Sequence, residues 1–97
     1  MQREEPFKSI ADRLWEVLEK EGHGSIERMA RNLSRQYDED IPAGTLYSYM
    51  TKKKAHRRRP QSPEAIILVA KILGLSAGKV VEIMAEENAR SREERGN

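Results

Sequence analysis

One stretch of the sequence decides the fold, SPEAIILVAKILGLS at residues 62–76. It opens with Ser62-Pro63-Glu64, which supplies a capping residue, a proline at the first helical position and an acid at the positive end of the helix dipole. Gly74 marks the end of the helix. The stretch therefore predicts a helix over residues 63–73 that is apolar on nearly every side. Such a helix either forms the centre of the core or also faces a partner subunit.

The same periodic pattern on both sides of this stretch predicts four more helices. Apolar residues spaced three and four apart recur over about residues 7–21, 26–35, 43–50 and 77–85. Ser9 with Asp12 forms a predicted capping box, and Ser25 and Ser76 are further N-cap candidates. The acidic residues 37–40 predict an extended turn between the second and third helices. We therefore expect an all-α fold of five helices without strands.

The length of 97 residues and the hydrophobic content of 37% are typical of one small domain with a modest core. We expect a flexible N-terminus at residues 1–6, a helical domain at 7–85 and a charged C-terminal tail at 86–97. The tail is predicted to be a solvated helical extension that frays. Cysteine is absent, and no apolar run approaches the roughly 18 residues of a membrane span. These features favour a soluble protein of the reducing cytoplasm.

Positive charge is concentrated in one segment of the chain. Six cations stand within eight consecutive positions, with no acid among them: Lys52, Lys53, Lys54, Arg57, Arg58 and Arg59. The rest of the chain has 12 of the 18 Lys and Arg residues and all 16 Asp and Glu residues, so it is slightly acidic outside this one basic segment. Because six like charges repel one another unless a polyanion neutralises them, the segment predicts contact with nucleic acid.

The predicted helix at 43–50 has an outward face suited to a DNA groove. A helix enters the major groove with its N-terminal half, so its outward side chains there must be small or able to hydrogen-bond base edges. Leu46, Tyr49 and Met50 share the inward face. The candidates for base contact are Ala43, Gly44, Thr45, Tyr47 and Ser48. No Arg, Asn or Gln occurs early in this helix, so strong bidentate base recognition is absent there.

The basic segment is the second part of the predicted interface. Its lysines are expected to neutralise phosphates. Its guanidinium groups either read guanine edges and narrow minor grooves or contact only the backbone, and the sequence leaves both possibilities open. The candidates for backbone or minor-groove contact are Thr51, Lys52, Lys53, Lys54, Arg57, Arg58 and Arg59.

Three stretches resemble the lambda-repressor-like family of helix-turn-helix DNA-binding domains, also called the Cro/repressor or XRE type. They are Ser25-Ile26-Glu27-Arg28-Met29-Ala30, residues 41–50 and residues 62–76, and the last is the most specific. The resemblance covers about residues 10–83 and implies a five-helix domain whose third helix lies in the major groove. It also implies a transcriptional regulator, a repressor of bacterial or phage type at the nucleoid. We expect such a protein to bind double-stranded DNA as a homodimer.

The sequence gives no sign of an enzyme, a cofactor or a small-molecule ligand. His23 and His56 lie in separate predicted loops without cysteine, so no metal site is expected, and no carboxylate is paired with a nucleophile or a histidine. Two other functions stay open. One is a protein-interaction module of the antitoxin or adaptor kind that uses the apolar fourth helix and the charged tail. The other is an RNA-binding protein that uses the arginine-rich loop.

Overall fold

The computed structural model describes residues 6–96, and the side chains of residues 6–93. Within this range it contains five α-helices, one short 3-10 turn and no strand, which confirms the predicted all-α class. The elements are α1 (Ile10–Lys20), α2 (Ile26–Tyr37), α3 (Ala43–Met50), η1 (Lys54–His56), α4 (Pro63–Leu73) and α5 (Ala77–Gly96). Apart from Pro6, the predicted flexible N-terminus lies outside the described residues.

The helix starts follow from the N-cap residues. Ser9 Oγ accepts a hydrogen bond from Asp12 N at 3.1 Å while Asp12 Oδ2 accepts one from Ser9 N at 3.0 Å, so the predicted capping box of α1 is confirmed. Ser25 and Ser62 cap α2 and α4 through their side-chain oxygens. α4 ends at Gly74, whose φ of 68° is unfavourable for a residue with a Cβ. The predicted bounds of α3 and α4 are both confirmed.

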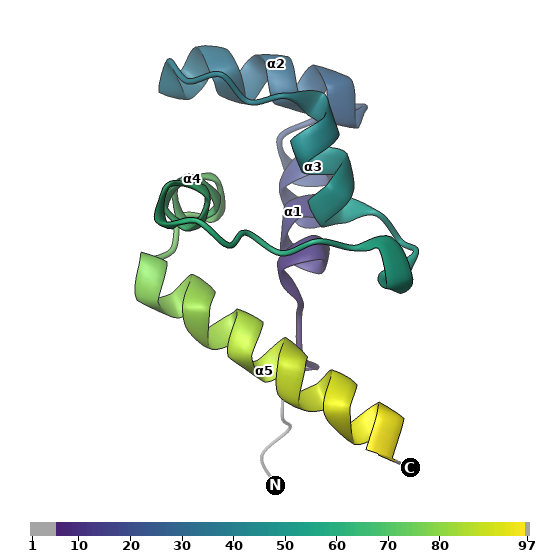
Figure 1. Ribbon diagram of the computed structural model, residues 1–97. Helices are drawn as coiled ribbons and strands as arrows, with labels where there is room; N and C mark the ends of the chain where they lie inside the picture. Colours follow the sequence, from purple (N-terminus) through teal and green to yellow (C-terminus); the bar gives the residue numbers. More distant parts are fainter. Residues whose placement is uncertain (1–5, 97) are drawn as a thin grey trace, which may run out of the picture.

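The core lies where α3, α4 and α5 pack against α1 and where α2 packs on α3 (Figure 1). Seven side chains with almost no exposed surface form its centre: Leu14, Met29, Leu33, Leu46, Met50, Val69 and Val80. All five helices contribute to this set, so each helix is stabilised mainly by apolar burial against the others. α4 buries Val69, Ala70 and Ile72 but exposes Ile67. It is therefore a core helix with one uncovered side.

The bounds of α1 and α2 differ from those predicted. α1 begins three residues later than expected because its N-cap is Ser9. α2 runs two residues further, to Tyr37, whose hydroxyl donates a hydrogen bond to Lys71 O on α4 at 3.1 Å. Asp38 then ends the helix in the left-handed conformation, with a φ of 51°. The first residue of the predicted extended turn at 37–40 therefore belongs to α2.

α5 is longer than the predicted core helix at 77–85. It continues without a break to Gly96, so the part of the predicted tail that the structure describes is helical. However, Glu87 is only 7% exposed, because the basic segment and the start of α1 cover its carboxylate. The prediction of a wholly solvated tail at 86–97 is therefore wrong at this residue.

Candidate nucleic-acid interface

α3 presents a face of small and hydroxyl-bearing side chains. Gly44 and Tyr47 are exposed, whereas Ala43, Thr45 and Ser48 are partly buried. The Ser48 hydroxyl donates a hydrogen bond to Thr45 O at 2.7 Å within the helix. While that bond persists, Ser48 offers a binding partner only the lone pairs of its oxygen. The five predicted base-contact candidates thus lie on one short helix, with Tyr47, at 44% exposure, as its large outward side chain.

Tyr47 is held by Glu27, a residue that the sequence analysis did not assign to the site. The Tyr47 hydroxyl donates a hydrogen bond to Glu27 Oε1 in the first turn of α2. This bond lowers the pKa of Glu27 from its ordinary value and raises the pKa of Tyr47, because it stabilises both the carboxylate and the protonated phenol. It also places a negative charge beside the outward face of α3.

The basic segment, residues 52–59, folds back against the C-terminal end of α3. Arg58 N donates a hydrogen bond to Ser48 O at 2.8 Å, and Arg57 Nε donates one to Thr51 O at 2.9 Å. The last carbonyl groups of a helix lack partners within the helix and carry the negative end of its dipole. A backbone N–H and a guanidinium are therefore suitable groups to cap them. The two bonds fix the last part of the segment, at Arg57 and Arg58, beside the end of α3.

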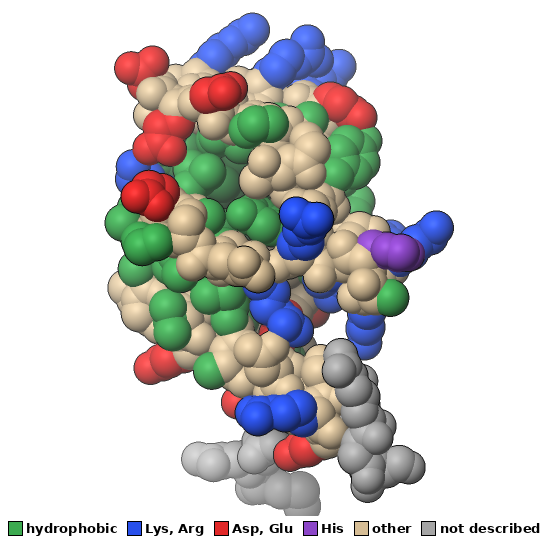
Figure 2. Space-filling model, in the orientation of Figure 1, with side chains coloured by type: hydrophobic (Ala, Val, Ile, Leu, Met, Phe, Trp, Pro, Cys, Tyr) green, Lys and Arg blue, Asp and Glu red, His purple; other side chains and the backbone are tan. Residues whose placement is uncertain are grey.

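Four cations of the segment are exposed and, among the described residues, have no salt-bridge partner: Lys52, Lys53, Lys54 and Arg58. Thr51 Oγ1 accepts a hydrogen bond from Lys53 N at 3.3 Å, which steadies the exit from α3. In Figure 2 Lys and Arg side chains (blue) follow the lower end of α3 and the segment beyond it, whereas the surface over α2 carries both charges.

Lys52 lies against an aromatic ring instead of projecting freely. Its Nζ is 5.1 Å from the centre of the Trp15 ring, within the range of a cation–π contact. Trp15 Nε1 in turn donates a hydrogen bond to Met50 O at 2.7 Å, so the indole also caps the last turn of α3. Trp15 therefore supports the site from α1.

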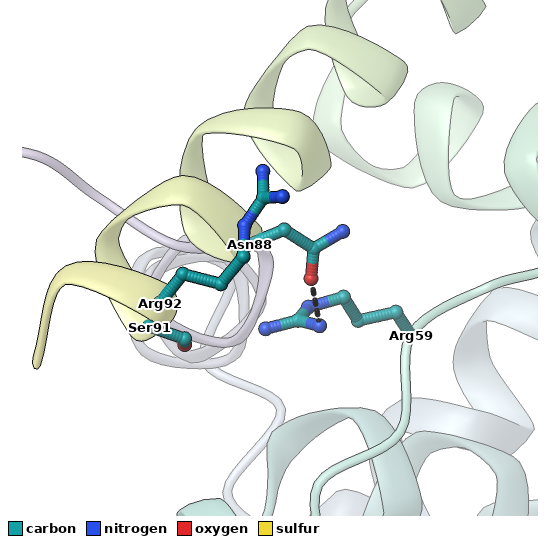
Figure 3. Close-up of a pocket in the computed structure, with 4 residues that line it drawn as sticks. All are labelled: Arg59, Asn88, Ser91 and Arg92. Carbon is teal, nitrogen blue, oxygen red and sulfur yellow. Dashed lines mark hydrogen bonds between the residues drawn. The ribbon is translucent and has the colours of Figure 1, made fainter. Parts of the chain in front are cut away.

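Arg59 differs from the other cations of the segment. Its Nε donates a hydrogen bond to Glu87 Oε2 at 3.0 Å, and its Nη1 donates one to Asn88 Oδ1, so the guanidinium is directed toward α5 (Figure 3). The Arg59 side chain is 35% exposed. It was expected to meet the DNA backbone or minor groove with its two neighbours. In the structure it joins the basic segment to α5 instead.

Glu87 is the second residue of the site that the sequence analysis missed. Its Oε1 accepts a hydrogen bond from Ile10 N, the first residue of α1, at 2.7 Å, while Oε2 binds Arg59. One buried carboxylate thus faces the positive end of the α1 dipole and a guanidinium. A sequence signal existed, because Glu87 continues the spacing of the buried Val80 and Ile83 along α5. Glu87 therefore ties the basic segment to two helices.

Two other kinds of feature, a metal centre and a membrane-spanning helix, are absent from the described part of the chain. Over residues 6–93, whose side chains are described, no group of three or more His, Cys, Asp or Glu side chains is arranged to hold a metal ion. None of the described helices is both long and apolar enough to cross a membrane. No family model, no curated protein and no solved structure matches this chain.

Proposed function

We propose that this protein is a sequence-specific transcriptional regulator that binds double-stranded DNA, with α2 and α3 acting as its helix-turn-helix pair. One observation carries the proposal: the bonds from Arg57 and Arg58 hold the basic segment directly beside the C-terminal end of α3. Duplex recognition needs a groove-reading helix together with groups that bind the backbone and fix its register. In this proposal α3 is the groove-reading helix, and the basic segment supplies the groups that bind the backbone.

The two surfaces have different tasks in this proposal. α3 enters the major groove, where Ala43 contacts thymine methyl groups and the Ser48 oxygen accepts hydrogen bonds from base amino groups. The Glu27 carboxylate is repelled by phosphates, so it faces the amino group of cytosine or adenine. Lys53 and Arg58 neutralise backbone phosphates.

We further propose that the protein binds as a homodimer through α4 and the start of α5. Ile67 and Val81 are 49% and 48% exposed, and Figure 2 shows hydrophobic side chains (green) along the edge where these helices lie. A recognition helix of 8 residues contacts few base pairs, so two half-sites about one helical turn apart suit a two-fold dimer. Ile67→Glu is expected to sediment as a monomer with unchanged circular dichroism. A wild-type protein that sediments as a monomer on a single asymmetric site contradicts the dimer.

Selection from a random duplex library tests the proposed function. The expected result is an enriched sequence with two-fold symmetry that binds at least about 10³ times more tightly than random duplex. The logarithm of affinity should fall linearly with the logarithm of salt concentration. If no sequence is enriched, or if single-stranded RNA competes as well as the selected duplex, the protein is not a sequence-specific reader of duplex DNA.

A further inference from the structure

The C-terminal half of α5 and the basic segment border a cleft that neither α3 nor the proposed phosphate-binding residues Lys53 and Arg58 line. One part is a pocket of about 350 Å³ lined by Arg59, Asn88, Ser91 and Arg92 (Figure 3). The three residues of α5 are spaced three and four apart, so they share one helix face, and Arg59 reaches toward it from the segment. A larger hollow of about 670 Å³ adjoins the pocket, since Arg59 and Ser91 line both.

Hydrogen-bond donors dominate the pocket in Figure 3. Arg59 already donates hydrogen bonds to Glu87 Oε2 and Asn88 Oδ1. The other carboxylate oxygen of Glu87 accepts a hydrogen bond from the backbone N–H of Ile10 in α1. The groups that remain are the Asn88 amide N–H₂, the Ser91 hydroxyl and the guanidinium N–H groups of Arg59 and Arg92. Arg92 is exposed and has no salt-bridge partner among the described residues. Such a set of donors suits a ligand whose oxygens only accept hydrogen bonds.

The charge of the cleft favours the same kind of ligand. Four cations and two acids line the larger hollow: Lys54, Arg57, Arg59, Arg90, Asp12 and Glu87. The Arg59 and Glu87 charges offset each other, and Arg90 pairs with Glu86 at 3.0 Å. Asp12 Oδ2 accepts a hydrogen bond from the backbone in the α1 capping box. Lys54 and Arg57, together with the adjoining Arg92, leave an excess of positive charge.

We propose that this cleft binds a phosphate group. Phosphate oxygens accept hydrogen bonds without donating any at full ionisation, and their spacing matches the planar fork of a guanidinium. Arg92 and Ser91 contact the phosphate, while Glu87 acts as a positioning residue that orients Arg59. The phosphate is either part of a DNA backbone that continues past the basic segment, which rests on the proposed function, or part of a free phosphate compound.

Titration with inorganic phosphate tests the site without DNA. Ionic strength is held constant with chloride, and nuclear magnetic resonance follows the Nε–Hε signals of Arg59 and Arg92 and the side-chain amide of Asn88. Saturable shifts at all three groups are expected. Arg92→Gln should weaken phosphate binding about 1.5- to 5-fold, as for the loss of one exposed ion pair. The matched control is Lys20→Gln, which removes one exposed cation at the opposite end of α1 and should leave the binding unchanged.

A second titration with duplex DNA identifies the source of the phosphate. If it belongs to the DNA backbone, Arg92→Gln reduces the slope of log affinity against log salt by about 0.9, and Lys20→Gln does not. If inorganic phosphate saturates the cleft while that slope is unchanged, or while no duplex is bound at all, the site stands and its ligand is a free phosphate compound. Shifts that do not saturate, or an equal effect of Arg92→Gln and Lys20→Gln on phosphate binding, overturn the site.

Discussion

Glu87→Gln is the substitution that most directly tests how the basic segment is held. Gln keeps the shape of Glu but has one carbonyl oxygen, so only one of the two donors, Ile10 N–H or Arg59 Nε–H, retains an acceptor. A buried donor without a partner costs about 1 to 3 kcal/mol. The lost ion pair adds no more than about 1 kcal/mol, because Arg59 is partly exposed and solvent screens its charge. We therefore expect the free energy of unfolding to fall by about 2 kcal/mol.

Urea unfolding followed by circular dichroism measures this loss, which corresponds to a decrease in Tm of about 8 to 16 °C for a chain of this size. The matched control is Glu86→Gln at the neighbouring position, where an exposed carboxylate pairs with Arg90. That variant should stay within about 0.5 kcal/mol of the wild type. If Glu87→Gln is as stable as the control, the carboxylate does not hold the segment and the reasoning is wrong.

Three other contacts give predictions of their own. Tyr47→Phe removes the donor to Glu27, so the pKa of that carboxyl rises toward its ordinary value, as a carboxyl carbon titration will measure. The bond needs an ionised Glu27 and a protonated Tyr47. Urea unfolding should therefore show Tyr47→Phe less stable than the wild type at neutral pH. The difference should disappear as the pH falls through the lowered pKa of Glu27 or rises through the raised pKa of Tyr47. Leu33→Ala should cost about 2 to 5 kcal/mol in urea unfolding, against under about 1 kcal/mol for Ile67→Ala, because Leu33 is 1% exposed and leaves a cavity. Lys53→Ala should weaken selected and random duplex equally and lower the salt slope by about 0.9, and a selective loss for the selected duplex contradicts its role at the backbone.

The fold was predictable where residues close in the chain determine it. The capping box joins Ser9 to Asp12 three residues later, and α4 starts and ends at the residues that its proline and glycine indicate. Periodic apolar residues give the number and type of the helices for the same reason. The bounds of α2 were less predictable, because the bond that anchors its last turn comes from Tyr37 to α4, 34 positions away.

The candidate site was predictable in composition but not in its contacts. The side chains of α3 and the run of cations are visible in the sequence. The partner of Tyr47 lies 20 positions away at Glu27, and the partner of Arg59 lies 28 positions away at Glu87. Tertiary packing selects such pairs, and several acids in this chain were equally plausible partners by sequence alone. On sequence alone, every cation of the segment is therefore a candidate for DNA contact.

The contacts of these cations change the expected salt dependence of DNA binding. Counted on the sequence, the six cations of the segment correspond to six phosphate contacts and a salt slope near −5, at about −0.9 for each contact. In the structure Arg59 is paired with Glu87, Arg57 caps α3 and Lys52 lies over Trp15. The remaining three cations correspond to a slope near −3. A slope near −5 would mean that DNA draws Lys52, Arg57 and Arg59 away from these contacts, and loosening of α5 should then accompany binding. A slope near −3 would mean that these residues stay in place as the support on which the outer cations meet the backbone.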